Sequence, residues 1–265
     1  MSFSVHRAMS PLTVRSKSTQ MMNEEREELS AHLRDLEEKS ARWHTHTASH
    51  FLNEEEVSAM QKEFPPSAFI RYDGGYPDAR KRKVIFLYDE EDDFSDVVCL
   101  QARVDQRFCK IGHRDVLGAV MALQVERSSF GDFWLEDDML YFYTEEEMAD
   151  FFIWNLTKIN QLNVHLERTD SHPVQHFKMR SFTAVAASER ADALVAALAH
   201  VSRAKAAEMI RMGMVSLNHE PLAAGDEVCD NNVTISIRGT GRFIYLGYER
   251  KTKAGRIAAQ FQQYI

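Results

Sequence analysis

The order of hydrophobic patterns between Val97 and Leu166 limits the folds open to this chain more than any other feature. Runs rich in β-branched and aromatic residues predict strands, and apolar residues at helical spacing predict helices. The predicted strands are 97–104, 130–135, 139–143 and 162–166, and the predicted helices are 113–123 and about 144–159, the second opened by a Thr144–Glu147 capping box. The order strand, helix, strand, strand, helix, strand is typical of a ferredoxin-like, split βαβ layer.

RNA-recognition motifs share this architecture. The aromatic-rich consensus with which such motifs stack RNA bases is absent here, so we do not expect base stacking on this sheet. The cores of the predicted strands and helices are expected to contain the aromatic residues Phe133, Trp134, Tyr141, Phe151, Phe152 and Trp154. Another β-rich run, 84–88, is assigned to the same domain, which we bound at residues 76–170.

The N-terminal part predicts a small helical unit over residues 23–75. Asn23 and the acids after it are typical of a helix start, and leucines at helical spacing extend the helix over 24–42. A second helix follows Asn53 and ends before Pro65-Pro66. Residues 1–22 lack acidic residues and are interpreted as a disordered tail. The alternatives are a transit peptide or a reading frame that starts at Met21 or Met22.

Residues 181–246 predict a compact module of a strand, two helices and a small sheet. Ser188 and Ser202 are candidate helix N-caps, and Gly213 suits the left-handed position after a helix. Strands are expected near 214–217, 233–237 and 242–246, and residues 247–265 are left as a basic C-terminal extension. The complete fold is therefore predicted as α+β, with three folded parts.

The charge of the chain is unevenly distributed. The net charge of -8 would ordinarily count against binding to nucleic acid. However, residues 1–179 contain 21 Lys and Arg against 32 Asp and Glu, whereas residues 180–265 contain 11 against 8. An acidic front part keeps a protein soluble while a local positive surface binds phosphate.

Composition excludes several other classes. The chain is 44% hydrophobic, but no apolar run approaches the length of a membrane span. Three separated cysteines favour a reduced compartment, and we expect a cytoplasmic protein. No cofactor or metal is predicted, since nothing completes the His172–His176 pair as a metal site.

Cations in the C-terminal module lie where a folded RNA backbone would be bound. Arg203 and Lys205 fall in the first turn of a helix, where backbone N–H groups and the helix dipole already favour phosphate. Arg190 opens the neighbouring helix. The candidate RNA-binding residues are Arg190, Asp192, Ser202, Arg203, Lys205, Asn218, Arg238 and Arg242. A run of four basic residues supplies secondary candidates, Arg80, Lys81, Arg82 and Lys83, although such a run is usually just solvated.

Two resemblances extend this interpretation. Arg190-Ala191-Asp192 and Ser202-Arg203-Ala204-Lys205-Ala206, followed by Gly213, Val215 and Asn218, resemble the RNA-binding domain of ribosomal protein S-four. Ala191 departs from that pattern, which usually has Leu. Over about residue 24 to the C-terminus, the chain also resembles the YlmH family of bacterial RNA-binding proteins. The motifs concerned are Arg71–Ala79, His113–Ala119, Val164–Arg168 and Arg238–Phe243.

The YlmH resemblance implies a helical start, a middle domain like an RNA-recognition motif and a terminal RNA-binding module. It also implies rescue of stalled large ribosomal subunits, with large-subunit rRNA, tRNA and the 50S subunit as partners, and a link to cell-division proteins. We therefore expect a non-enzymatic RNA-binding protein. His113-Arg114-Asp115 copies a kinase triplet without the Asn and glycine loop that a kinase needs. The alternatives are an RNA-modifying enzyme, similar to a pseudouridine synthase, and an adaptor for the cell-division apparatus.

Overall fold

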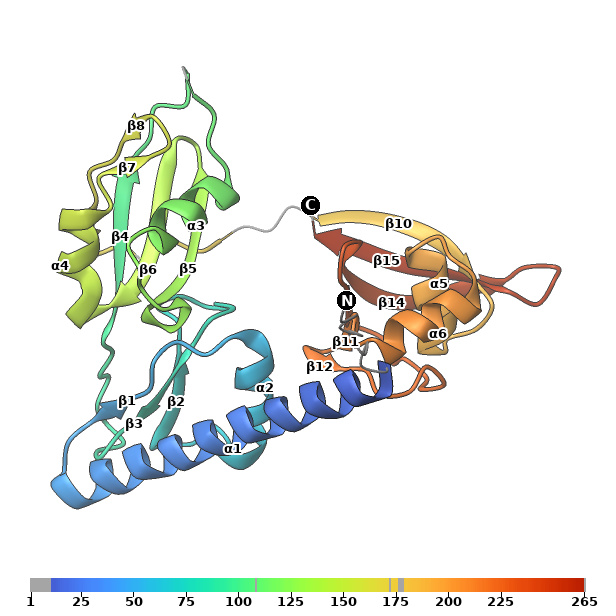
Figure 1. The fold of residues 1–265 in the computed structure, drawn as a ribbon, viewed down its shortest axis with the longest axis horizontal. Coiled ribbons are helices and arrows are strands. Elements are labelled where there is room, and N and C mark those ends of the chain that lie inside the picture. Colours follow the sequence, from blue (N-terminus) through green and yellow to red (C-terminus); the bar gives the residue numbers. More distant parts are fainter. Residues whose placement is uncertain (1–10, 108, 172, 176–178, 265) are drawn as a thin grey trace, which may run out of the picture. The chain divides into compact units, whose positions relative to one another are not determined.

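The computed structural model describes residues 11–107, 109–171, 173–175 and 179–264, with the backbone alone over 11–23 (Figure 1). Helices and strands are both abundant, which confirms the predicted α+β class. The chain divides into a larger unit, Glu27–Gln175, and a second unit that includes the described residues 179–264. No described helix is long and apolar enough to cross a lipid bilayer.

The N-terminal part of the larger unit combines two helices with a small sheet. The helices are α1 (Pro11–Trp43), which belongs to this unit from Glu27 onward, and α2 (Glu54–Glu63), and the strands are β1 (Thr47–Ala48), β2 (Ile70–Asp73) and β3 (Lys83–Phe86). The strands pair antiparallel in the order β1-β3-β2. Their inner faces and the helices share one apolar core, which contains Leu33, Met60 and Phe86.

Some predictions for this part are confirmed and others need correction. The Asn53 side chain accepts hydrogen bonds from the backbone N–H groups of Glu55 and Glu56, and the Glu56 carboxylate accepts the Asn53 N–H, so the second helix follows Asn53 as predicted and is capped by it. Helix α1 begins at Pro11 rather than at residue 24, so residues 11–22 of the predicted tail are helical. Proline suits the first position of a helix because it has no N–H to leave unpaired. Residues 1–10 lie outside the described residues.

The predicted boundary at residues 75 and 76 is also wrong. Strand β3 pairs with β1 and β2, so the run 84–88 belongs to the N-terminal sheet and not to the middle domain. The N-terminal part is consequently not purely helical. Its strands contain two to four residues, which is too short for the alternating pattern that identifies a strand in a sequence.

The middle layer has the predicted order of elements. It contains β4 (Val97–Arg103), α3 (His113–Met121), the 3-10 turn η1 (Arg127–Ser129), β5 (Phe130–Glu136), β6 (Met139–Glu145), α4 (Glu146–Asn155), the small hairpin of β7 (Lys158–Ile159) and β8 (Leu162–Asn163), and β9 (Glu167–Thr169). The antiparallel sheet has the order β5-β6-β4-β9, so each strand–helix–strand unit encloses a strand of the other. The final sheet strand is β9, which begins after the predicted strand 162–166.

The predicted capping box at Thr144 and Glu147 does not form. Thr144 is buried in β6, where its hydroxyl donates to the Ser129 carbonyl at 3.1 Å. Glu145 occupies the N-cap position of α4, and its side chain makes no cap hydrogen bond. The helix ends at Asn155, four residues before the predicted end at 159. A cap motif in a sequence therefore does not form a helix cap when its hydroxyl is hydrogen-bonded elsewhere in the folded protein.

The two faces of this sheet are covered differently. Helices α3 and α4 pack on one face around Leu100, Phe142 and Phe152. On the other face, the Tyr76 ring lies 5.3 Å from Trp134 and 5.1 Å from Tyr143, measured between ring centroids. These rings belong to a second apolar cluster. They are packed against one another, as expected for Trp134, whereas Trp154, which the sequence also assigned to the core, is 77% exposed.

Glycine is required beneath Tyr76. The φ of Gly75 is +88°, and a Cβ there would lie 2.4 Å from the nearest atom of the Tyr143 ring. Any other residue would have to displace a fully buried aromatic side chain in addition to adopting a strained backbone. The Gly74-Gly75 motif thus brings the loop after β2 onto the sheet.

The second unit places two helices on a six-stranded sheet. Its elements are β10 (Met179–Ala186), α5 (Ala191–Leu198), α6 (Arg203–Arg211), β11 (Val215–Leu217), β12 (Glu220–Pro221), β13 (Val233–Ile237), β14 (Gly241–Lys251) and β15 (Ile257–Tyr264). The antiparallel order is β10-β15-β14-β13-β11-β12. Leu194 and Ile210 from the helices pack with Ile235, Tyr245 and Phe261 from the sheet.

The predicted strands and helices of this unit are all present, but the sheet is larger than expected. The predicted basic extension, 247–265, contains the end of β14 and the whole of β15. Strand β15 pairs with β10 and β14 at once, so it lies inside the sheet and is not an appendage. Its alternating pattern, with Ile257, Ala259 and Phe261 buried, is the signal that could have identified it.

Candidate nucleic-acid interface

Three of the predicted RNA-binding residues form one cluster at the starts of α5 and α6. Arg203 donates from Nη2 to Oδ2 of Asp192 at 2.6 Å, and Arg190 donates from Nε to Oδ1 at 3.3 Å. Arg190 is the N-cap residue of α5, and Arg203 is the first residue of α6. We call Arg190, Asp192 and Arg203 the Asp192 cluster. It fixes two guanidinium groups from adjacent helices on a single carboxylate.

Burial within the cluster is unequal. The Asp192 side chain is 11% exposed, whereas those of Arg190 and Arg203 are 42% and 50% exposed. Burial would raise the pKa of Asp192, but hydrogen bonds from both arginines outweigh it and hold that pKa below its usual value. The carboxylate therefore stays charged and oriented, while the two cations remain accessible to a ligand.

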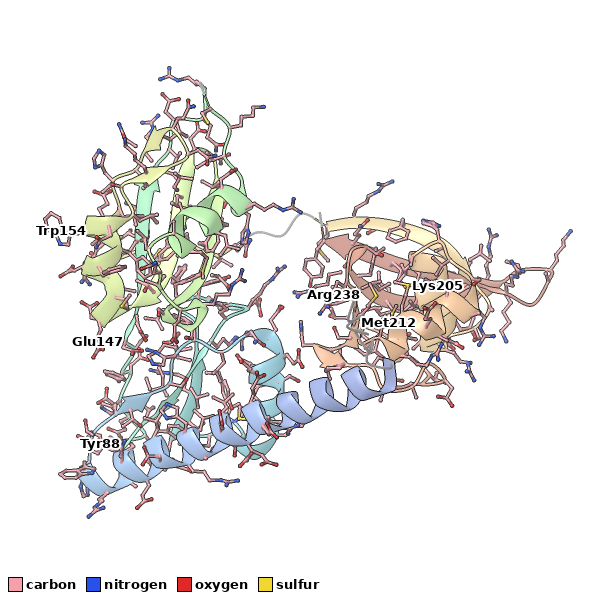
Figure 2. The ribbon with its side chains drawn as sticks, in the orientation of Figure 1. Tyr88, Glu147, Trp154, Lys205, Met212 and Arg238 are labelled. Atoms are coloured by element: carbon pink, nitrogen blue, oxygen red, sulfur yellow. The ribbon has the colours of Figure 1, made fainter. Side chains whose placement is uncertain are left out.

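Backbone groups add to the positive character at α6. The Ser202 hydroxyl accepts the Lys205 N–H at 3.2 Å, which confirms the predicted cap and leaves other N–H groups of the first turn without an intrahelical partner. The Lys205 ammonium pairs with Glu208 at 2.9 Å, and the side chain is half exposed (Figure 2). Gly213 follows the helix with a φ of +67°, as predicted.

The other candidate residues lie on the sheet. Arg238 follows β13, is exposed, and donates its backbone N–H to the Met214 carbonyl at 2.9 Å. Arg242 is half-buried on β14, with its guanidinium 5.8 Å from the centre of the Tyr264 ring. The structure therefore brings Arg190 and Arg203 together on Asp192. Arg238 and Arg242 lie at the end of β13 and the start of β14 and are not part of that cluster.

Asn218 has a structural role in the turn between β11 and β12. Asn218 and His219 both have positive φ, 46° and 71°, which is typical of a tight hairpin turn. The Asn218 side-chain oxygen accepts the Thr234 N–H at 2.9 Å, and its own N–H donates to the Thr234 carbonyl. The residue thus joins the hairpin to β13, and this bonding accounts for an asparagine at that position.

The secondary candidates around Arg80 belong to a loop held by one carboxylate. Oδ2 of Asp132 accepts the Tyr76 hydroxyl at 2.8 Å and the Arg80 N–H at 2.6 Å. Arg82 donates its Nε–H to the Ala79 carbonyl at 2.7 Å. The Lys81 ammonium donates to the carbonyls of Arg127 and Phe130, and burial lowers its pKa to about 8. The side chains of Lys81 and Arg82 thus bind the protein's own backbone.

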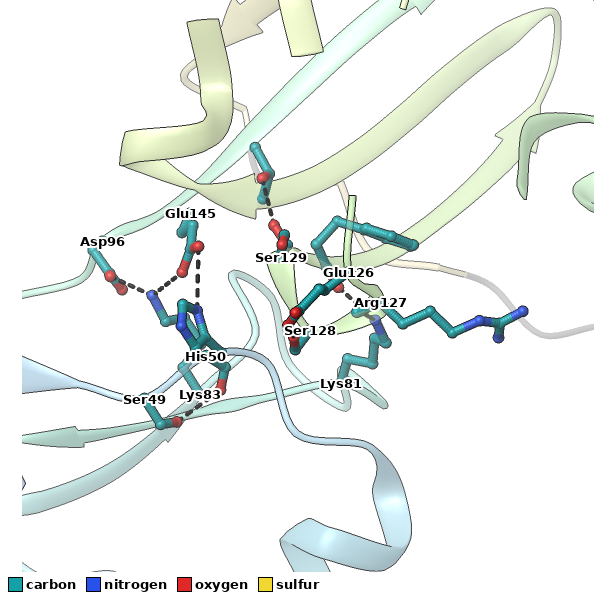
Figure 3. A network of polar contacts seen from close by, with 12 residues as sticks. Ser49, His50, Lys81, Lys83, Asp96, Glu126, Arg127, Ser128, Ser129 and Glu145 are labelled. Atoms are coloured by element: carbon teal, nitrogen blue, oxygen red, sulfur yellow. Dashed lines mark hydrogen bonds and ion pairs between the residues drawn. The ribbon is translucent and has the colours of Figure 1, made fainter. Parts of the chain in front are cut away.

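Lys83 is not available to RNA, which corrects its assignment as a candidate. Its side chain is 2% exposed, and its ammonium pairs with Asp96 and, at 2.9 Å, with Oε2 of Glu145 (Figure 3). His50 Nδ1 lies 3.4 Å from Oε1 of the same Glu145. We call these four residues the Lys83 cluster. It joins β3 of the N-terminal sheet to the junction of β6 and α4.

Sequence reasoning missed Asp132 and Glu145, which orient the loop and bind Lys83. Both lie about 50 residues or more from the groups that they bind, so no local motif marks them.

The residues of the kinase-like triplet His113-Arg114-Asp115 have structural contacts. Asp115 accepts the Gly112 N–H and caps α3, and His113 stacks on Phe133. Among the described residues, no three His, Cys, Asp or Glu side chains are grouped so that they could hold a metal ion.

Comparison with known protein families identifies a match that covers the middle layer. The family described as "Putative RNA-binding domain in YlmH" matches residues 89–172. These residues include the complete four-stranded sheet with α3 and α4. This part of the chain is therefore a domain of the YlmH type.

Two longer matches cover more of the chain than the middle layer. "Ribosome-associated protein quality control protein P2" of Bacillus subtilis (strain 168) is 29% identical over 202 residues, which are 73% of this chain and 77% of that protein. The solved structure "Cell division protein ylmH from Streptococcus pneumoniae" is 16% identical, with a TM-score of 0.42 over 63% of this chain and 96% of its own. The family model and the Bacillus relative confirm the resemblance to the YlmH family that the sequence motifs predict. The S-four-type assignment of residues 181–246 stays a prediction.

Proposed function

We propose that this protein is a non-enzymatic, cytoplasmic RNA-binding protein that docks on structured ribosomal RNA or tRNA. Its task would be quality control at stalled large ribosomal subunits. The YlmH-type domain and the ribosome-associated relative support an RNA-binding, ribosome-associated role. The finer role is our inference from the resemblance and from the charges of the C-terminal unit.

The Asp192 cluster is the observation that carries the proposal. Two half-exposed guanidinium groups are held side by side by a carboxylate that lies mostly below the surface. Guanidinium groups bind phosphate oxygens in bidentate geometry, and the start of α6 adds N–H groups and the positive end of the helix dipole. Because the arginines are already oriented, less side-chain entropy is lost when RNA binds. Docking of this kind stabilises an RNA conformation and needs no covalent step.

The test is a salt titration of RNA affinity for the double variant Arg190→Ala/Arg203→Ala, with ribosomal RNA and tRNA as ligands. If both arginines contact phosphate, the plot of log affinity against log salt should become flatter by about 1.4 to 1.8, equivalent to two phosphate contacts. Lys39→Ala/Arg42→Ala removes two cations from α1 and should leave the slope unchanged. An unchanged slope for the first variant, with circular dichroism confirming its fold, would refute the proposed contact.

A charge-preserving variant separates geometry from charge. Arg190→Lys/Arg203→Lys retains both cations but loses the paired N–H groups that bind a carboxylate or phosphate. Affinity should fall while the slope of the salt plot stays close to that of the unmodified protein. Turnover of the RNA, seen as a modified nucleoside after incubation with the protein, would contradict the non-enzymatic assignment.

A further inference from the structure

The hairpin between β14 and β15 carries a group of cations that the Asp192 cluster does not include. Strand β14 contains 11 residues and β15 contains eight, and the loop between them projects past α5 and α6 (Figure 1). The segment from Tyr248 to Arg256, which we call the basic hairpin tip, contains four cations and one acid. The cations are Arg250, Lys251, Lys253 and Arg256, and all four are exposed.

We propose that the basic hairpin tip is a second RNA contact, which binds the ribose-phosphate backbone at a distance from the Asp192 cluster. The inference rests on the proposed function, since it extends the same RNA interface. It concerns residues that no motif of the sequence singled out for binding.

The conformation of the tip is fixed by hydrogen bonds in its turn and by buried residues at the base of the hairpin. Tyr245, Ala259 and Phe261, at the base of the hairpin, are fully buried in the core of the unit. At the other end, the Thr252 N–H donates to the Arg256 carbonyl at 2.6 Å, and Gly255 adopts a φ of +74°. The Arg256 N–H donates in turn to the Thr252 hydroxyl at 3.1 Å. The cations are thus presented on a closed, hydrogen-bonded turn.

The charge of the tip is not neutralised by the protein, in contrast to that of the helices. Arg190 and Arg203 share Asp192, and Lys205 pairs with Glu208. Within the described part of the chain, the cations of the tip form no ion pair, and Glu249 is the one acid of the tip itself. Uncompensated cations in water gain most from a polyanion because phosphate binding releases condensed counterions.

Protection of a strand edge does not explain all four cations. Strand β13 pairs with β14 up to Tyr245, so Arg250 and Lys251 lie on a β14 segment that β13 does not cover. Lysine and arginine are common at such edges because they prevent pairing with another chain. Lys253 and Arg256, however, lie in the turn, where there is no edge to protect. Tyr248, 40% exposed at the start of the tip, adds a ring on which an unpaired base could stack.

The test compares the full chain with a variant in which all four cations of the tip become glutamine. Affinity for ribosomal RNA is measured across a salt series. If two to four of these side chains contact phosphate, the slope of the log–log plot should become flatter by about 1.4 to 3.6. The matched control exchanges each arginine for lysine and each lysine for arginine, and it should retain the slope. Circular dichroism and thermal unfolding check that the hairpin variant is folded.

The outcomes separate this inference from the proposed function. If the hairpin variant keeps the full slope while Arg190→Ala/Arg203→Ala loses part of it, the tip is not an RNA contact and the proposed function stands. If the unmodified protein does not bind RNA, both proposals fail. If the hairpin variant instead loses binding to anionic lipid vesicles or crosslinks to acidic segments of its own chain, with RNA affinity unchanged, the tip has a different partner. Ultraviolet crosslinking of RNA to the peptide that contains Tyr248 would support the proposal directly.

Discussion

The Lys83 cluster and the Asp192 cluster both hold cations against carboxylates, but water reaches them to different extents. In the first, the cation is buried, with Lys83 only 2% exposed between Asp96 and Glu145. In the second, the carboxylate is the less exposed partner, and Arg190 and Arg203 remain about half exposed around it. In the Lys83 cluster the cation joins two parts of the fold and is not accessible to a ligand. In the Asp192 cluster the cations remain accessible.

The comparison shows why a count of basic residues is a poor guide to a binding surface. The run Arg80–Lys83 is the densest basic stretch in the front of the chain, yet Lys83 is buried and Lys81 donates to backbone carbonyls. The cations of the C-terminal unit are more scattered in sequence, but they occur at helix starts and in a hairpin turn, where the side chains stay accessible. The accessibility of a cation and the identity of its partner decide its role.

The largest effect is expected for Lys83→Met. Removing one partner of a buried ion pair leaves Asp96 and Glu145 without their cation, which typically costs about 3 to 5 kcal/mol. Denaturant unfolding should therefore show a large loss of stability, whereas Lys158→Met, at an exposed position, should change it by less than about 0.5 kcal/mol. RNA affinity of the folded Lys83→Met protein should be unchanged. A loss of RNA affinity without loss of stability would show instead that Lys83 serves RNA binding and not the fold.

A smaller loss is expected for Asp132→Asn. The amide keeps one acceptor oxygen but removes the charge that holds the Tyr76 hydroxyl and the Arg80 N–H, so the loop loses about 1 to 3 kcal/mol of anchoring. The pKa of Tyr76 is raised, first by burial and then by the charge and hydrogen bond of Asp132. Thermal unfolding measures the loss. Asp138→Asn is the control, because its φ of +63° suits asparagine equally well.

Local signals in the sequence predicted several helix ends but not all of them, since Arg190 and not Ser188 is the N-cap residue of α5, and α1 begins before Asn23. Asn53 and Ser202 cap their helices as expected, and Gly213 takes the left-handed conformation. Prediction failed where distant partners decide the outcome. The hydroxyl of Thr144 bonds to Ser129 in a buried strand, so the motif that resembles a cap does not function as one.

The same limit applies to the candidate site. The spacing of Arg190 and Asp192 placed them at a helix start, and an orienting role for Asp192 was foreseeable from their proximity. The sequence could not show that Arg203, 11 residues from Asp192, would share its carboxylate. Nor could the basic run before β3 reveal that Glu145, 62 residues away, would bind Lys83. Contacts between residues so far apart in sequence depend on how entire helices and strands pack against one another.

A pH-dependent effect should distinguish the Asp192 cluster from a pair of solvated arginines. In the folded protein the pKa of Asp192 lies below its usual value, so the charged carboxylate stabilises the fold above about pH 4 and loses this contribution as the pH falls through the folded pKa. Asp192→Asn should thus lower stability by about 1 kcal/mol at pH 7, because both arginines are partly solvated. The difference should shrink near pH 3. Asp230→Asn, at an exposed position outside the cluster, should show no comparable difference in denaturant unfolding at either pH.

The smallest effect on stability, and the clearest separation of stability from binding, is expected for Arg238→Ala. Arg238 is exposed, and its backbone N–H, which the substitution keeps, makes the bond to Met214. Unfolding should therefore change by less than about 0.5 kcal/mol. If the side chain contacts phosphate, the salt plot of RNA affinity should still flatten by about 0.7 to 0.9, and Arg238→Lys should restore it. A normal slope for Arg238→Ala would remove the end of β13 from the interface, since it would show that a cation there remains in water when RNA binds.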